Sequence, residues 1–213
     1  MVAGHIGTFE LKPGRRDEFL AVMAAMKAWQ EGHGAVVWAR GSVVAGPESG
    51  RLSLTALFPD PAARAAYFDA IATEVANSPM GQMVVAADPP ATPISRVLFN
   101  EIGESSGISD SPPLQMAIIY AQGAGQASEA EAALQALKER WAEVGVQSRT
   151  LRTLFGGSAT GRLARVVSFD GWAALETAGA AYQALDSPTP SRAAVASGAL
   201  TVLSQSSSVR IDL

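Results

Sequence analysis

The chain repeats itself at an offset of 111 residues. Residues 14–63 align with residues 125–174 without a gap, and 13 of the 50 pairs are identical. The matches include SGRL at 49–52 and TGRL at 160–163, each followed six residues later by phenylalanine, and a glycine at 34 and at 145. Alanine richness alone does not place such motifs at equal spacing. We therefore interpret the chain as a tandem duplication.

A stretch of different composition separates the two copies. Residues 103–113, GESSGISDSPP, are rich in Gly, Ser and Pro and show no hydrophobic periodicity, which is typical of a linker. We predict a first unit at residues 1–102, a linker at 103–113 and a second unit at 114–213.

Each unit shows the element order β-α-β-β-α-β. In the first, we expect strands at 5–11, 35–44, 51–58 and 94–102, helices at 15–32 and 60–77, and a hairpin connection at 45–50, AGPESG. The first helix carries one apolar stripe, and the second opens with Asp60 as N-cap and Pro61. In the second unit we expect the same order, with strands at 114–122, 148–155, 162–169 and 199–211 and helices at 128–144 and 171–185.

This element order predicts the fold class α+β. A β-α-β-β-α-β unit forms a four-stranded antiparallel sheet with both helices on one face, which is the ferredoxin-like arrangement. The other face of each sheet also carries apolar residues and must be covered. We expect the two tandem ferredoxin-like units to pack sheet to sheet as an intrachain α/β-barrel.

The residues resemble the dimeric α/β-barrel superfamily, which includes the antibiotic-biosynthesis monooxygenases, the NIPSNAP-like proteins and the stress-responsive barrel proteins. The resemblance rests on TFELKPGRRDEFL at 8–20, FPDPAARAAYFDAI at 58–71, VLFNEI at 97–102 and SSSVRIDL at 206–213. It implies ligand cavities between each sheet and its helices. Members include cofactor-free oxygenases, polyketide cyclases, isomerases, haem enzymes and proteins without known chemistry, so the resemblance implies no single activity.

GHIGTFEL and VVWARG also resemble the first two strands of plant polyketide cyclases of the stress-responsive group. His5 matches a histidine at the mouth of the first strand in those proteins, and Trp38 matches an aromatic residue on the second. The cyclases also use a histidine and a tyrosine around the second helix. Tyr67 can stand for the tyrosine, but AIATEVANSPM at 70–80 contains no histidine.

His5 is the first candidate for chemistry. Strand alternation places it on one face with Phe9; if that face looks toward the helices, the imidazole lies in a cavity bounded by Met23, Met26 and Tyr67. An imidazole of ordinary pKa can take a proton from a phenol or an activated carbon acid. The alternative is a strand-end histidine that hydrogen-bonds to backbone or water. Residues 103–213 contain no histidine, so we expect any catalytic cavity in the first unit.

Trp38 and Arg40 share one face of the second strand. Together they could stack an aromatic ligand and pair with a carboxylate or enolate, or they could serve core packing and pairing across the barrel. Arg51 and Arg162 recur after a turn glycine in both copies, which favours a structural role. Arg149 belongs to a polar strand that binds an anionic group or only completes the barrel.

Composition excludes several classes of function. The chain has no cysteine and two histidines, so disulfides, thiolate catalysis and a transition-metal site are not expected, although a single histidine could still ligate haem. A net charge of −4 with scattered Lys and Arg predicts neither a nucleic-acid nor a membrane partner. The chain shows no leader pattern, so a cytoplasmic location is expected.

We predict a cofactor-independent enzyme that acts on a mid-sized hydrophobic, phenolic or polyketide-like molecule. It would be monooxygenase- or cyclase-like and work by proton abstraction, with no cofactor, His5 as base and Tyr67 as donor to the developing oxyanion. Substrate contacts are expected from Phe9, Met23, Met26, Trp38 and Arg40. The alternatives are a non-catalytic small-molecule-binding or interaction protein with a filled barrel and, third, a haem-binding barrel enzyme. Two chains could also form a homodimer through their pseudo-dimeric units.

Overall fold

The structure is a computed structural model that describes residues 1–43, 50–103, 107–108, 110–185 and 189–213. Most of the predicted hairpin connection at 45–50, and part of the predicted linker at 103–113, therefore lie outside the described residues. The described parts carry eight strands and six α-helices.

The elements of the first unit follow the expected order with two additions. They are β1 (Ala3–Leu11), α1 (Arg16–Gly32), β2 (Val36–Ser42), β3 (Leu52–Phe58), α2 (Pro61–Ile71), a short 3₁₀ turn (Val75–Asn77), α3 (Pro79–Val85) and β4 (Ala91–Glu101). Helix α2 begins as its sequence predicts, because the Asp60 carboxylate accepts a hydrogen bond of 2.7 Å from the Ala63 amide. After α1, Gly34 takes the left-handed φ of 84° that favours glycine at a helix end.

The second unit has the same order. Its elements are β5 (Leu114–Gln122), α4 (Ala127–Glu143), β6 (Ser148–Phe155), a 3₁₀ turn (Gly157–Ala159), β7 (Leu163–Phe169), α5 (Trp172–Ala184), α6 (Pro190–Ala196) and β8 (Leu200–Arg210). The short helices α3 and α6 were not expected from the sequence. Each spans seven residues, too few to show a periodic apolar stripe, although each begins with a proline, the residue that favours a helix start.

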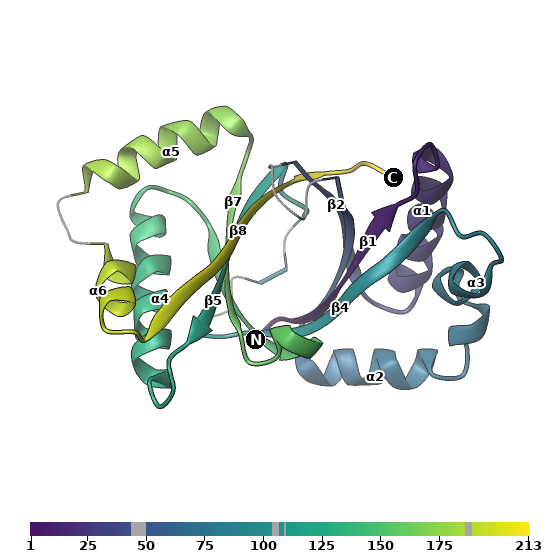
Figure 1. The fold of residues 1–213 in the computed structure, drawn as a ribbon, viewed down its shortest axis with the longest axis horizontal. Helices are drawn as coiled ribbons and strands as arrows, with labels where there is room; N and C mark the ends of the chain where they lie inside the picture. The colour runs from purple at the N-terminus through teal and green to yellow at the C-terminus, as the bar shows by residue number, and fades with distance from the viewer. Residues whose placement is uncertain (44–49, 104–106, 109, 186–188) are drawn as a thin grey trace.

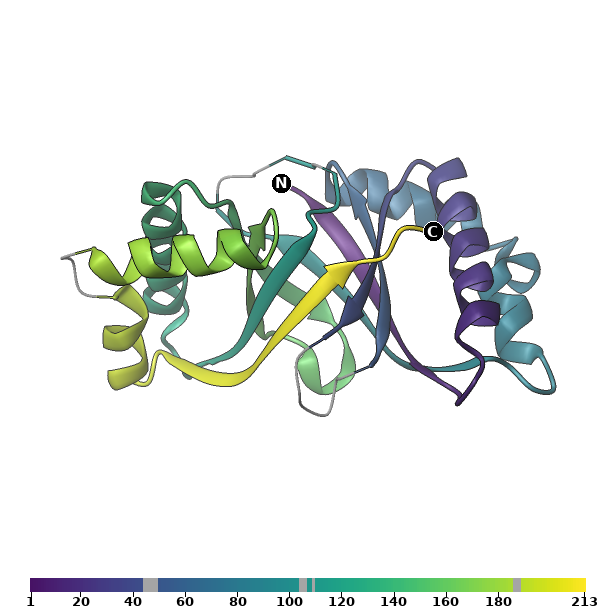
Figure 2. The same cartoon turned by 90° about the horizontal axis from the view of Figure 1, so that it is seen from above.

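The eight strands close into one antiparallel barrel in the order β1-β3-β2-β8-β5-β7-β6-β4 (Figures 1 and 2). The fold class is α+β, as predicted. The sheets of the two units join twice: β2 pairs with β8 at Arg40–Ser42, and β4 pairs with β6 at Leu98–Glu101. Figure 2 shows the helices of the first unit on one flank of the barrel and those of the second unit on the other.

The hydrophobic core therefore has two separate helix-covered parts. One contains Phe9, Phe19, Met23 and Met26 between the first sheet and its helices, and the other contains Leu114, Leu134, Leu163 and Trp141 in the second unit. A third, smaller apolar cluster lies between the two sheets and contains Val2, Trp38, Leu57, Phe99 and Leu151.

No helix in the described ranges is long and apolar enough to cross a membrane.

Candidate functional site

A cavity of about 350 Å³ lies between the first sheet and its helices. Its walls come from β1, β3 and β4 on the sheet side and from α1, α2 and the α3 region on the other. Most of its lining is apolar, including Phe9, Leu54 and Ile71. The side chains at its walls that can form hydrogen bonds are those of His5, Trp29, Gln30, Tyr67, Ser78, Ser95 and Arg96.

The His5 imidazole lies in this cavity wall and is 4% exposed. Three aromatic rings surround it, those of Phe58, Tyr67 and Phe68, at centroid distances of 5.6–6.1 Å. The preceding residue must be glycine, since a Cβ at Gly4 would lie 2.5 Å from the Phe99 ring and 2.7 Å from the Ala56 carbonyl oxygen. Close packing on both faces of β1 thus fixes the position of the imidazole.

The two nitrogens of His5 have different surroundings. Nε2 lies 3.4 Å from the side-chain nitrogen of Gln30, whereas Nδ1 is buried and has no hydrogen-bond partner among the described residues. If the amide of Gln30 donates, Nε2 is the acceptor and the proton of the neutral ring sits on Nδ1. Nε2 is then the atom that can take a proton from a bound molecule.

Burial keeps this imidazole neutral. Loss of solvent, followed by the positive charges of Arg96 and Arg64, lowers the pKa of His5 from 6.5 to about 3. The direction is the one expected for an imidazole in an apolar cavity. At pH 7 the ring is therefore uncharged and its acceptor nitrogen is available, but it binds protons weakly until a ligand changes its surroundings.

Tyr67 and Arg96 complete the polar end of the cavity. Burial raises the pKa of Tyr67, with Arg96 and a hydrogen bond from Gln30 acting in the opposite direction, so the phenol is a neutral donor at pH 7. Arg96 is exposed but lies on the same face of the sheet as Gly7, with which it pairs, and the central carbon of its guanidinium is 5.2 Å from the centre of the Phe68 ring. Helix α2 is anchored behind them by Arg64, which donates to the Phe99 carbonyl oxygen at 2.6 Å.

The structure brings three of the seven predicted site residues together. His5, Phe9 and Tyr67 line the cavity. Met23 and Met26 are at most 2% exposed and pack in the core beside it, without lining it. They can support the wall but do not reach a molecule in the cavity as it stands.

Trp38 and Arg40 lie on the opposite face of the sheet. Both Ile6 and Trp38 pair with Thr55, and residues paired across neighbouring strands share a face. Trp38 therefore faces the barrel interior with Ile6, while His5 faces the helices. Arg40 also faces inward and donates to Ser208 Oγ at 2.9 Å and to the Pro112 carbonyl oxygen at 2.7 Å.

Sequence reasoning missed Gln30, Ser78 and Arg96. Gln30 had a detectable signal, since it continues the series Phe19, Met23 and Met26 at helical spacing but is polar. Ser78 accepts a hydrogen bond from the Gly81 amide as N-cap of α3, and its place before Pro79 was a readable start signal. Arg96 had no local signal, because only the fold of β4 beside β1 brings it to the cavity.

The corresponding space in the second unit is occupied by side chains. Trp141, which aligns with Gln30, stacks on Tyr182 at a centroid distance of 4.3 Å. Arg165, which aligns with Leu54, is 1% exposed and donates to the Leu134 carbonyl oxygen and to Ser148 Oγ, both at 2.7 Å. These large residues fill the volume that remains open beside His5.

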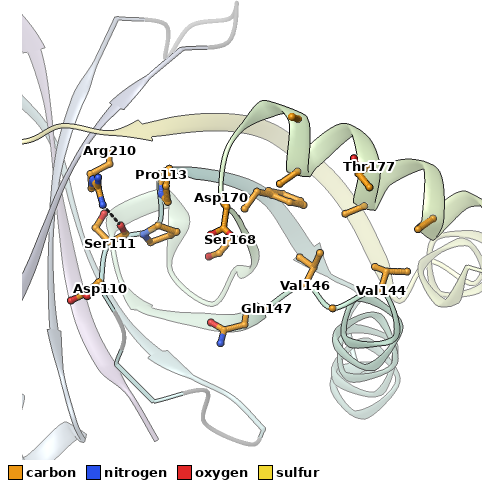
Figure 3. A pocket seen from close by; sticks show the side chains of 17 residues that line it. Asp110, Ser111, Pro113, Val144, Val146, Gln147, Ser168, Asp170, Thr177 and Arg210 are labelled. Atoms are coloured by element: carbon orange, nitrogen blue, oxygen red, sulfur yellow. Dashed lines mark hydrogen bonds between the residues drawn. The ribbon is translucent and has the colours of Figure 1, made fainter.

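The second unit has a larger but more open groove of about 930 Å³ between the barrel and α5 (Figure 3). Its lining includes alanines of α5 and the polar residues Ser111, Gln147, Asp170 and Arg210. Arg210 donates to the Ser111 carbonyl oxygen at 3.2 Å. Without an imidazole or a buried polar group directed into it, this groove offers less chemistry than the smaller, better enclosed His5 cavity.

The residues present do not fit a histidine-bound haem, the cofactor that the superfamily resemblance left open. A haem needs room for its whole macrocycle beside the ring nitrogen that binds the iron, whereas His5 Nδ1 is buried and the cavity of about 350 Å³ has the size for a smaller molecule. The other histidine, His33, lies 2.7 Å from the Trp29 carbonyl oxygen through Nδ1 and 3.3 Å from Glu74 through Nε2. Among the described residues, no three His, Asp or Glu side chains gather as a metal site.

Several solved structures share this architecture. A proposed monooxygenase from Fusobacterium nucleatum has a TM-score of 0.63 and 7% identity, covering 99% of this chain and 93% of that chain. An anthrone oxidase-like protein has a TM-score of 0.58 and 12% identity, covering 99% and 92%. A variant of chlorite dismutase from Candidatus Nitrospira defluvii has a TM-score of 0.59 and 12% identity, covering 99% and 92%.

These similarities show the fold. The neighbours are chlorite dismutase-like and monooxygenase-like proteins of the ferredoxin-like α+β kind. No protein-family model matches the sequence, and no curated protein matches it.

Proposed function

We propose that the protein is an enzyme that removes a proton from a mid-sized hydrophobic phenol or polyketide-like molecule, followed by oxygenation or ring closure without a bound cofactor. The observation that carries this proposal is the neutral His5 imidazole in an apolar cavity of about 350 Å³, a size suited to a small organic ligand. An anthrone oxidase-like protein and a proposed monooxygenase with the same fold support it.

The cavity residues divide into a base and two groups that favour negative charge. His5 Nε2 accepts the proton of the bound phenol or carbon acid, and the Tyr67 hydroxyl donates to the oxyanion that forms. Arg96 stabilises the same charge electrostatically. Because the positive charge of Arg96 contributes to the low pKa of His5, an anion beside Arg96 raises that pKa and makes the imidazole a better base.

The apolar rim suits a hydrophobic molecule. Met80, Val84 and Ile94 line the cavity, and Val84 and Ile94 are 56% and 40% exposed. Exposed aliphatic residues at a cavity entrance favour a ligand that buries them.

The test is oxygen consumption with 1,8-dihydroxyanthrone as probe, in which one O₂ is used and one water released per quinone formed. We expect turnover by the full chain, and a loss of about 10²-fold or more in His5→Ala, the effect of removing a general base. His33→Ala is the matched control, because His33 is the other histidine and lies outside the cavity lining. Equal turnover in His5→Ala and wild type would remove His5 from the mechanism.

A non-catalytic binding protein is the second candidate. The enclosed Nδ1 and the strongly lowered pKa of His5 favour it, because both make the imidazole a weak base in the unliganded protein. Binding of the anthrone, measured by quenching of tryptophan fluorescence, without any oxygen consumption or change of the ligand would decide for this function.

A further inference from the structure

The barrel interior holds a second cavity, of about 410 Å³, on the opposite face of the first sheet from His5. Eight-stranded barrels have an interior that side chains fill or that holds one small ligand. Here many inward positions carry short hydroxyl side chains, so room remains. The polar lining comes from strands of both units and includes Ser42, Thr55, Ser95, Gln115, Thr153 and Ser206.

Two arginines that the duplication relates line this same cavity. Arg51 and Arg162 each follow a glycine with a φ of 78°, Gly50 and Gly161, and each precedes the strand that leads into the barrel wall. Both arginines are half-buried. The repeated SGRL and TGRL motifs thus bring two arginines to one space, of which Arg51 already has an interaction of its own.

A third arginine adds positive charge deeper in the lining. Arg40 is 3% exposed, and its hydrogen bonds go to the hydroxyl and carbonyl oxygens of Ser208, to Ser111 Oγ and to the Pro112 carbonyl oxygen. These acceptors are neutral, so they hold the side chain without cancelling its charge. Burial, followed by the charge of Arg210, lowers the pKa of Arg40 to about 10, which still leaves it protonated at pH 7.

The charged residues in the described lining of the cavity are all basic. Among the described residues that line it, three are arginines and none is Asp or Glu. The Arg162 guanidinium, moreover, makes no hydrogen bond or ion pair with any residue in the described ranges. Guanidinium groups and hydroxyls that line one cavity match carboxylate oxygens, which accept charge-assisted hydrogen bonds.

We propose that the barrel interior is a binding site for a small dicarboxylate. Its two carboxylates pair with Arg51 and Arg162, and its middle lies against the serine and threonine hydroxyls. The positive field of Arg40 favours the dianion over neutral molecules of the same size. This site is separate from the His5 cavity and does not depend on the activity proposed there.

The experiment is calorimetric titration of the full chain with succinate, and in parallel with inorganic phosphate, at low ionic strength. We expect succinate to bind, and its affinity to fall about tenfold or more in Arg162→Gln and in Arg51→Gln, because each loses a charge-assisted hydrogen bond. Arg192→Gln is the matched control, since it removes one positive charge from an exposed position on α6. Its affinity for succinate should equal that of the wild type.

Two further variants keep the test decisive. Ala117→Leu places a larger side chain in the cavity from β5 and should abolish binding while circular dichroism shows an intact fold. His5→Ala should bind succinate as the wild type does. The proposal is overturned if the wild type does not bind succinate or binds phosphate alone. It is also overturned if both arginine variants bind succinate with the affinity of the wild type, or if His5→Ala loses binding.

Discussion

The two units share one strand order, but the space beside His5 is a cavity in the first unit, whereas the aligned space in the second unit is filled by side chains. The difference comes from a few aligned positions. Gln30 aligns with Trp141, Ile71 with Tyr182, and Leu54 with Arg165. Each change adds a larger side chain to the second unit, and His5 is replaced there by Met116. A duplicated fold can therefore keep its architecture while side-chain volume decides which copy can hold a ligand.

The second helix of each unit differs as well. Asp60 caps α2, and Arg64 fixes it to the carbonyl oxygen of Phe99. Helix α5 instead follows Gly171, which provides no side-chain cap and has a φ of 143°. At its other end α5 is held by Arg140, which donates to the Tyr182 and Leu185 carbonyl oxygens, and the open groove lies beside this helix (Figure 3). Secure anchoring of α2 keeps Tyr67 against His5.

The largest effect should come from separating the units. Residues 1–102 expressed alone would expose the apolar inner face formed by Trp38, Leu57 and Phe99. We expect this fragment to self-associate or aggregate, because a large exposed apolar surface drives association. Size-exclusion chromatography with light scattering measures it. A stable, soluble monomer of the fragment would contradict the dependence of each sheet on the other.

Removal of the stacked tryptophan should strongly destabilise the second unit. Trp141→Ala deletes a buried ring packed on Tyr182 and Phe169, and we expect a loss of about 3–5 kcal/mol in the free energy of unfolding. Trp29→Ala in the first unit should cost about 1–2 kcal/mol, since Trp29 is half-buried and borders a cavity. Urea denaturation measures both. Equal costs would mean that the two interiors are equally well packed.

Replacing His5 by the residue of the second unit should change the pH dependence of stability. The pKa of His5 is about 3 in the folded protein and 6.5 in the unfolded chain, so the unfolded state binds more protons between these values. The stability contributed by the neutral ring is therefore present above pH 6.5 and is lost as the pH falls toward 3. The expected loss is about 1.4 kcal/mol per pH unit, or about 2 kcal/mol between pH 6.5 and pH 5.

In His5→Met this part of the acid sensitivity should disappear, with stability at pH 7 similar to that of the wild type, because an unpartnered buried nitrogen is replaced by an apolar group. Denaturant titrations at pH 5 and pH 7 measure the difference. His33→Ala serves as the control, and the idea fails if the wild type and His5→Met lose the same stability on acidification.

The smallest expected effect concerns the side-chain N-cap of α2, which its counterpart α5 lacks. Asp60→Ala removes the acceptor for the Ala63 amide and should cost about 1 kcal/mol of unfolding free energy. The aligned change Gly171→Ala should also destabilise, but through strain at a φ of 143° and not through a lost cap. A free energy of unfolding close to that of the wild type in Asp60→Ser, together with a loss in Asp60→Leu, would establish that the side-chain oxygen is responsible.

Much of this architecture was accessible from local patterns. The repeat and the local patterns predicted the eight strands and four of the helices, and alternation placed His5 and Phe9 on one face of β1. Which side of the sheet this face meets was decided by the fold. Alternation could not show whether His5 and Trp38 lie on the same face of the sheet, because the pattern within one strand does not fix the register in which it pairs with another strand. Pairing of both Ile6 and Trp38 with Thr55 set Trp38 and Arg40 inside the barrel, away from His5.

The sequence by itself determined the strand and helix order, because hydrophobic periodicity, glycine and proline positions and capping residues act over a few residues. Only the tertiary structure decided which side chains share a cavity. Gln30, Ser78 and Arg96 come together from α1, the start of α3 and β4, and Arg51 and Arg162 come together from two different units. Such convergence depends on strand register and on the volume left by packing, which are properties of the whole folded chain.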